Sequence, residues 1–257
     1  MKAMILAAGL GTRLRPWTLK HPKALVPVKG VPMIKRVIDR MKKADVDTVC
    51  VNIHHFGDQI ITYLKENDPG VDWIISDERS GLLDTGGGLL QACGILFEKD
   101  DDPFLVHNVD ILSNADLIQL MKSHEKSGND ITLLTSGRAS SRKLIIGKDS
   151  RLRGWHNTST GEYRPEGFVS EEGDREVAFS GIYVMGKGAY EHLNRYAEDR
   201  HTNVFPVMDF FLDNIDKVKI GEYYSEDLQL IDIGKPATLD KANEAGIDLL
   251  NDEFNGE

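Results

Sequence analysis

Residues 1–23 read MKAMILAAGLGTRLRPWTLKHPK, and this stretch decides the fold. The apolar run Ala3–Ala8 is typical of a buried strand, and it ends at the turn-forming sequence Gly9-Leu10-Gly11. Glycine has no Cβ, so its backbone N–H groups can approach an anion closely. A strand that runs into such a loop predicts an α/β protein with a phosphate-binding turn after its first strand.

Two cations follow the loop. Arg13 carries a planar, always-charged fork that suits phosphate oxygens, and Lys23 carries a mobile point charge. Pro22 biases His21 toward an extended backbone, so we expect Lys23 to lie outside any helix and to point inward. The third glycine of the dinucleotide fingerprint is missing, and the chain has no P-loop pattern. A structural turn is the alternative for the glycines alone, but the two cations favour phosphate binding.

The run LAAGLGTRLRPWTLKHPKALVPVKGVPMI, residues 6–34, closely resembles the signature of the sugar-1-phosphate nucleotidyltransferases. These enzymes join a nucleoside triphosphate to a sugar 1-phosphate and release pyrophosphate. The resemblance implies that Arg13 contacts phosphates and that Lys23 bridges toward the reacting groups, which makes them the catalytic candidates. It implies nucleotide binding by the loop and its flanks, namely Leu6, Ala7, Ala8, Gly9, Gly11, Thr12 and Arg13.

Strands and helices alternate through the first half of the chain. Met33–Met41 has apolar residues at helical spacing, while Thr48–Ile53 and Val71–Ser76 are β-branched runs with a predicted helix between them. This alternation predicts a Rossmann-like, doubly wound, mixed and mainly parallel sheet, and the weaker pattern beyond it suits a small sugar-binding lobe.

We expect one domain over residues 1–257. About 1–135 would form the nucleotide-binding half, about 136–235 the acceptor-sugar half, and 236–257 a C-terminal helix. No hexapeptide repeat or second module is visible in the sequence, so a stand-alone enzyme is expected.

A second unusual stretch is Leu83-Asp84-Thr85-Gly86-Gly87-Gly88, which precedes an apolar helix predicted over Leu89–Phe97. A flexible connector or a helix N-terminus would explain three glycines. We favour a loop on which a base or sugar lies against bare backbone. The resemblance places nucleobase and ribose contacts here, so Gly86 and Gly87 are candidates.

Two aspartates stand at predicted strand ends. The strand Pro103–Val109 leads to Asp110, and the strand Leu228–Ile233 contains Asp232 just before a helix started by Pro236. Carboxyl ends of strands border the ligand crevice in open α/β sheets, and Mg²⁺ typically takes one or two carboxylates together with substrate phosphates. The resemblance identifies Asp110 and Asp232 as Mg²⁺ ligands, although Asn-Val-Asp stands where the family commonly has Gly-Asp. Helix capping or a turn is the alternative for Asp110, and a turn is the alternative for Asp232.

The acceptor site is less clearly marked. The resemblance implies sugar contacts at Asn108 and at Gly181, which interrupts the strand VAFSGIYVM over residues 177–185. Many relatives carry a Glu-Lys-Pro motif whose lysine meets the sugar phosphate, and this sequence has none. Trp155, Asn157 and Arg164 lie in the corresponding stretch, and the sequence does not decide among them.

Composition limits the partners. A net charge of −10 argues against nucleic acid and anionic membranes, because both call for a basic surface. Cys50 and Cys93 have no metal-binding spacing and are expected to be free thiols. There is no signal peptide and no apolar run of the ~20 residues that a bilayer requires, so we expect a cytoplasmic monomer or small homo-oligomer.

The sequence therefore predicts transfer of a nucleotidyl group from a nucleoside triphosphate to a sugar 1-phosphate, with Mg²⁺ as cofactor. UTP is slightly favoured and GTP is next. Two alternatives stay open, a non-catalytic nucleotide-sugar-binding regulator and a transferase that acts on an alcohol phosphate such as phosphocholine.

Overall fold

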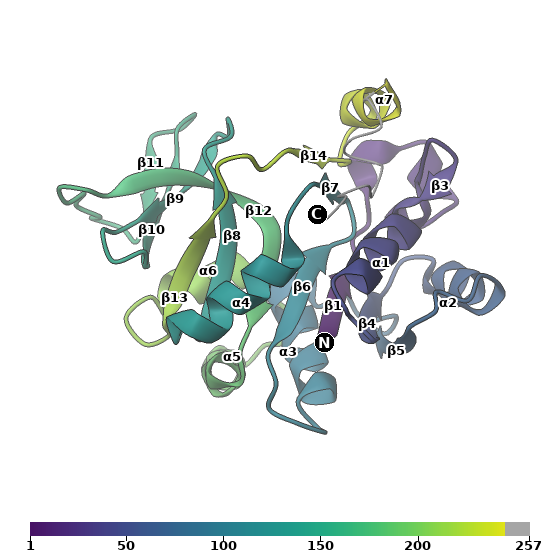
Figure 1. Ribbon diagram of the computed structural model, residues 1–257, viewed down its shortest axis with the longest axis horizontal. Coiled ribbons are helices and arrows are strands. Elements are labelled where there is room, and N and C mark those ends of the chain that lie inside the picture. The colour runs from purple at the N-terminus through teal and green to yellow at the C-terminus, as the bar shows by residue number, and fades with distance from the viewer. Residues whose placement is uncertain (245–257) are drawn as a thin grey trace, which may run out of the picture. The chain divides into compact units, whose positions relative to one another are not determined.

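The computed structural model describes residues 1–244, in which strands and helices alternate along most of the chain (Figure 1). The strands are β1 (Lys2–Leu6), β2 (Pro27–Val28), β3 (Val31–Pro32), β4 (Thr48–Ile53), β5 (Asp72–Asp77), β6 (Phe104–Asn108), β7 (Ile111–Ser113), β8 (Ile131–Ser136), β9 (Arg142–Ile146), β10 (Leu152–Asn157), β11 (Glu162–Arg164), β12 (Arg175–Met185), β13 (Ile220–Tyr224) and β14 (Leu230–Asp232). The helices are α1 (Met33–Lys43), α2 (Gly57–Glu66), α3 (Asp84–Leu96), α4 (Leu117–Ser127), α5 (Lys187–Asp199), α6 (Val207–Asp213) and α7 (Pro236–Glu244). Short 3₁₀ helices cover Thr12–Leu14, Trp17–Leu19 and Lys23–Leu25.

The chain divides into two compact units. Among the described residues, the first unit contains Met1–Leu82, His107–Ala115 and residues 229–244, and the second contains Leu83–Val106 and Asp116–Leu228. Strand β6 carries the chain from one unit into the other. The functional halves expected from the sequence remain a prediction.

The main sheet of the first unit is parallel. β1 pairs with β4 and β4 pairs with β5, so their carboxyl ends share one edge, where Leu6 is opposite Asn52 and Asn52 is opposite Ser76. Residues 3–5 are completely buried, as expected for the apolar run that opens the chain. The amphipathic helix predicted from residue 33 is confirmed as α1, whose apolar face is buried.

A separate hydrophobic cluster joins distant parts of the first unit. It connects the segment after the glycine loop, the β2–β3 hairpin, β7, β14 and α7. Burial of apolar side chains contributes about 25 cal/mol for each Å² removed from water, and here it stabilises contacts between the two ends of the described chain. Its buried members are Leu14, Val26, Val28, Met33, Leu112, Ile231, Ile233 and Ala242.

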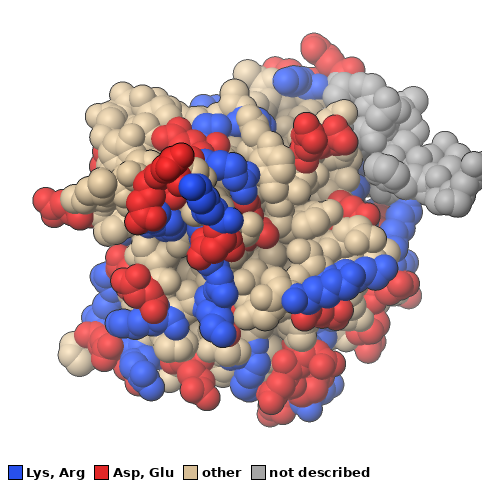
Figure 2. Space-filling model, turned by 60° about the vertical axis from the view of Figure 1, so that its left-hand side comes forward, with Lys and Arg blue, Asp and Glu red and all other residues tan. Residues whose placement is uncertain are grey.

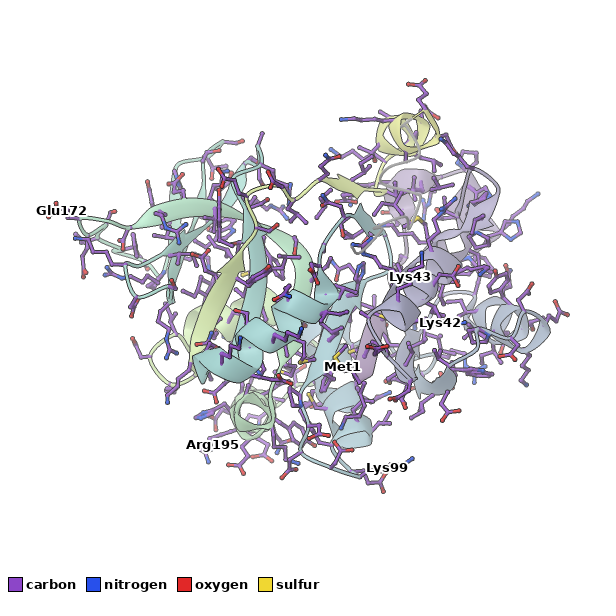
Figure 3. All side chains as sticks on the ribbon, in the orientation of Figure 1. Met1, Lys42, Lys43, Lys99, Glu172 and Arg195 are labelled. Carbon is purple, nitrogen blue, oxygen red and sulfur yellow. The ribbon has the colours of Figure 1, made fainter. Side chains whose placement is uncertain are left out.

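The second unit has a mixed sheet. β13 pairs with β8 in parallel, and β8, β12, β9, β10 and β11 follow one another in antiparallel pairs. The register of β12 against β8 shifts between Phe179 and Tyr183, and Gly181 has a φ of +77° within this bulge. The interruption predicted at Ser180-Gly181 is therefore confirmed. Glu172 lies at the outer end of the loop between β11 and β12 (Figure 3).

Several boundaries differ from the prediction. Helix α3 begins at Asp84, so the three glycines lie inside the helix and not in a loop before it. Lys23 lies in a single 3₁₀ turn, although we expected it outside any helix. The final helix begins at Pro236, and the part of the predicted helix beyond Glu244 lies outside the described residues. The α/β class with a mixed sheet is confirmed.

Within the described part of the chain, no helix combines the length and the apolar character that crossing a membrane requires. Basic and acidic side chains are interspersed on the face drawn in Figure 2.

Candidate active site

The glycine loop that follows β1 has backbone N–H groups without a hydrogen-bond partner among the described residues. Among residues 1–244, no hydrogen bond uses the backbone N–H of Gly9, Leu10 or Gly11, and Gly9 and Leu10 are exposed. Gly11 has a φ of +59°, and a Cβ there would lie 2.9 Å from Cγ2 of Thr18 and 3.1 Å from Cβ of Lys23. A side chain at position 11 would therefore be strained and crowded. The loop offers donors to an anion, as the sequence predicted.

Lys23 forms an ion pair with Asp110. Its ammonium donates to a carboxylate oxygen of Asp110, and the two side chains are only 13% and 17% exposed. Pro22 approaches in an extended conformation, with φ −69° and ψ 149°. The prediction that Lys23 points inward is therefore confirmed.

The small sheet of β7 and β14 brings the second aspartate to this place. Asp232 is opposite Ile111 in the register of the pair, and the N–H of Ile233 donates to the carbonyl of Asp110 over 2.8 Å. Asp110 and Asp232, 122 positions apart in the numbering, thus lie on adjacent backbone segments.

Arg13 lies beside Asp232. A Cβ on Gly234 would be 2.6 Å from Oδ1 of Asp232 and 2.7 Å from Nη2 of Arg13, so the two side chains flank this buried glycine closely. The structure thus gathers Arg13, Lys23, Asp110 and Asp232 around the glycine loop of the first unit. Such a group of cations and carboxylates is suited to holding an anion together with its counter-ion.

The carboxylate pair fits a magnesium ion. Residues 1–244 contain no cluster of three or more His, Cys, Asp or Glu side chains placed to hold a metal. Mg²⁺ needs less from the protein, because it keeps several waters and takes one or two carboxylates plus substrate phosphates. Asp110 already attracts the ammonium of Lys23, and Asp232 is exposed. These oxygen donors match the chemistry of the ion.

Asn108 lies at the end of β6, two residues before Asp110, and its side chain is partly buried. Its carbonyl accepts a hydrogen bond from Nδ1 of the preceding His107 over 2.7 Å. Burial lowers the pKa of His107 to about 4, so this imidazole is neutral and structural.

Gly86 and Gly87 belong to the second unit, where the first turns of α3 pack tightly on residues 203–205. A Cβ on Gly87 would lie 1.7 Å from the carbonyl oxygen of Asn203, and one on Gly86 would lie 2.4 Å from the ring of Phe205. The N–H of Gly86 donates to the carbonyl of Phe205 over 2.8 Å. Close packing within the chain therefore requires both glycines, whether or not a nucleotide also lies against them.

Gly181, the other predicted sugar contact, lies in the β12 bulge of the second unit. A cation that the sequence reasoning did not single out lies at one end of this bulge, because Nη2 of Arg138 donates to the carbonyl of Phe179 over 2.6 Å. Lys143 donates in turn to the carbonyl of Arg138 over 2.9 Å. Only the paired strands bring these residues together, and no motif marks them.

Arg164 is engaged by helix α6. It forms ion pairs with Asp209 at 2.7 Å and with Asp213 at 3.7 Å, and the hydrogen bond that it donates to Asp209 raises its pKa. This arginine joins β11 to α6. Of the other two residues left open by the sequence, Asn157 accepts from the N–H of Ser159 in a turn and Trp155 is partly buried in β10.

Comparison with known proteins gives the family of the chain. A family model described as nucleotidyl transferase matches residues 2–144, which is more than half of the chain, and the chain belongs to this family. An N-acetylmuramate alpha-1-phosphate uridylyltransferase of Caulobacter vibrioides is 44% identical over 113 residues, 42% of this chain and 45% of the relative. A probable mannose-1-phosphate guanylyltransferase 1 of Oryza sativa is 36% identical over 210 residues, 80% of this chain and 55% of the relative. The chain thus spans about half the length of these curated relatives.

Solved structures share the fold over nearly the whole chain. HddC from Yersinia pseudotuberculosis superposes with a TM-score of 0.71 at 25% identity, covering 95% of this chain and 98% of that one. A putative glucose-1-phosphate thymidylyltransferase from Bacillus anthracis, 18% identical, gives a TM-score of 0.75 over 100% of this chain and 98% of that one.

Proposed function

We propose that this protein transfers a nucleotidyl group from a nucleoside triphosphate to a sugar 1-phosphate and releases pyrophosphate. The observation that carries the proposal is the group of Arg13, Lys23, Asp110 and Asp232 around an open glycine loop. Membership of the nucleotidyl transferase family supports it. UTP is the first choice of triphosphate and GTP the second, and the names of the uridylyl- and guanylyltransferase relatives support both candidates.

The chemistry is an in-line attack by a phosphate oxygen of the sugar on the α-phosphorus. Its main difficulty is electrostatic, because two polyanions must meet. The free N–H groups of the loop hold the triphosphate, while Arg13 and Lys23 offset charge where it develops. Asp110 and Asp232 would hold Mg²⁺, which supplies further charge neutralisation when bound. Asp110 also orients the ammonium of Lys23. Because the sugar phosphate attacks the α-phosphorus directly, no protein nucleophile is required.

Nucleotide contacts at Leu6, Ala7, Ala8, Gly9, Gly11, Thr12, Gly86 and Gly87, and sugar contacts at Asn108 and Gly181, belong to the same proposal. The functional halves follow from it as well. We place the protein in the cytoplasm because Cys50 and Cys93 are buried thiols outside any disulfide, which suits a reducing compartment. We also infer a monomer or small homo-oligomer.

The test is pyrophosphate release with Mg²⁺ across a grid of nucleoside triphosphates and sugar 1-phosphates. The sugars are glucose, mannose, heptose, N-acetylglucosamine and N-acetylmuramate, and phosphocholine is included as a non-sugar acceptor. We expect turnover in one column of the grid, with UTP or GTP. Release with phosphocholine alone would favour the alcohol-phosphate alternative. A grid without turnover, from protein that still binds a triphosphate, would favour the regulatory alternative.

A further inference from the structure

A buried asparagine connects the glycine loop to the rest of the sheet. Asn52 is the last but one residue of β4, is 2% exposed, and interrupts an otherwise apolar strand that reads TVCVNI. Its amide oxygen accepts from the N–H of Ala7 over 2.6 Å and from the N–H of Ala8 over 3.3 Å. These are the first two residues after β1, where the chain leaves the sheet and becomes the loop.

A buried carboxylate fixes this amide. Nδ2 of Asn52 donates to Oε1 of Glu78 over 2.6 Å, and Glu78 is 1% exposed. Only one orientation of the amide satisfies both sides, because the loop offers donors and the carboxylate offers an acceptor. The amide therefore cannot rotate by 180° without losing hydrogen bonds at both ends.

The backbone holds Glu78 in place. Its N–H donates to the carbonyl of Ile53 over 2.8 Å, and its own carbonyl accepts from Nδ1 of His54 over 2.7 Å. A continuous path of hydrogen bonds thus crosses the carboxyl ends of β5, β4 and β1 and ends on the loop. Every residue in it except the half-buried His54 is buried, and a buried polar group left unsatisfied costs about 1–3 kcal/mol.

From this network we infer that Asn52 is a positioning residue for nucleotide binding, and that Glu78 holds its amide in the required orientation. The inference rests on the proposed function. The network occupies the N–H groups of Ala7 and Ala8 and fixes where the chain departs, while the N–H groups of Gly9, Leu10 and Gly11 stay open. A ligand that needs several backbone donors at once is bound tightly only where the loop is already in the right shape.

The first variant is Asn52→Ala, studied by equilibrium binding of UTP and GTP and by hydrogen exchange of the amides of residues 7–13. We expect faster exchange and a dissociation constant raised by about 10- to 100-fold, because small misplacements of a binding group are costly. Asn214→Ala is the matched control. Asn214 is also a buried asparagine, 6% exposed, and its amide donates to the carbonyl of Phe210 in α6. This control is expected to lose stability without a change in affinity.

The second test exchanges the amide and carboxyl groups between positions 52 and 78. Asn52→Asp alone would place two buried carboxylates side by side and should lose both affinity and stability. Adding Glu78→Gln restores the pairing, because the carboxylate at position 52 accepts from the loop while the amide at position 78 donates to that carboxylate. The pair thus keeps one carboxyl and one amide group. We expect the double variant to recover triphosphate affinity to within about tenfold of wild type.

The outcomes are distinct. Wild-type affinity in Asn52→Ala, equal losses in Asn52→Ala and Asn214→Ala, or no recovery in the exchanged pair would each overturn the inference. Failure of wild-type protein to bind any triphosphate would overturn the proposed function, and the inference would fall with it. Recovery in the exchanged pair supports the positioning role even if Asn52→Ala does not fold.

Discussion

Lys23 and Asp110 are oppositely charged and largely buried, so each side chain compensates the charge of the other. Lys23→Met keeps most of the side-chain volume but leaves the carboxylate without its cation, and we expect a loss of about 1–3 kcal/mol in the free energy of unfolding. Because the proposed function places this ammonium where charge develops, turnover should fall by about 100-fold or more. Urea unfolding and pyrophosphate release measure the two effects separately.

The double variant Lys23→Met with Asp110→Asn separates the structural role of this pair from its chemical role. Neither partner is then charged, so most of the lost stability should return, whereas activity should not. Recovery of turnover together with stability would mean that the pair only supports the fold.

The residues of the site differ in how far the sequence could predict them. Arg13 and Lys23 belong to one continuous motif, and Asp110 and Asp232 stand at strand ends, so each could be proposed from local pattern. The roles of Asn52 and Glu78 depend on the register of β1, β4 and β5, which no local pattern gives. The available signal was a polar residue near the end of an apolar strand.

Helix α3 offers a matched pair of glycines. In Gly87→Ala the new methyl group would lie 1.7 Å from the carbonyl oxygen of Asn203, so the helix must move away from residues 203–205. We expect a loss of about 1–3 kcal/mol in the free energy of unfolding. Gly94 lies on the exposed side of the same helix, where the nearest contact would be the Tyr190 hydroxyl at 3.5 Å. Gly94→Ala should stabilise the protein by about 0.5–1 kcal/mol through helix propensity.

Triphosphate affinity, measured on the same two variants, tests the nucleotide contact proposed for Gly87. Lower affinity in Gly87→Ala is expected if the base or ribose lies against this turn. Unchanged stability in Gly87→Ala would contradict the packing that the structure describes.

Elements with strong local periodicity could be predicted, and those defined by distant partners could not. Strand β4 and helix α1 follow directly from β-branched and amphipathic patterns. The three-residue strand β7 exists because β14 pairs with it from far along the chain, and this pairing brings Asp232 beside Asp110. The predicted start of α3 at Leu89 was wrong, because a run of three glycines is unfavourable in an isolated helix. In the folded protein, packing of these glycines against residues 203–205 compensates for that cost.

For the whole molecule, buried histidines make stability depend on pH. Burial lowers the pKa of His107 from an ordinary value of 6.5 to about 4 and also lowers the pKa of His124. As pH falls below 6.5, these histidines become protonated in the unfolded chain while they stay neutral in the folded protein, so the free energy of unfolding decreases. His107 contributes about 3 kcal/mol to the free energy of unfolding in this way. This contribution is complete above pH 6.5 and is lost as the pH falls toward about 4.

His107→Asn tests this pH dependence. The asparagine amide can still donate to the carbonyl of Asn108, as Nδ1 of the imidazole does, but it does not titrate. We expect the decline in the free energy of unfolding between pH 6.5 and 4 to become shallower in the variant, with the remaining slope due in part to His124. Asp47 and Asp77, whose hydrogen bonds lower their pKa values from 3.8, act in the same direction but only at more acidic pH. Equal slopes for wild type and variant over this window would show that His107 accepts a proton in the folded protein without cost, contrary to its complete burial.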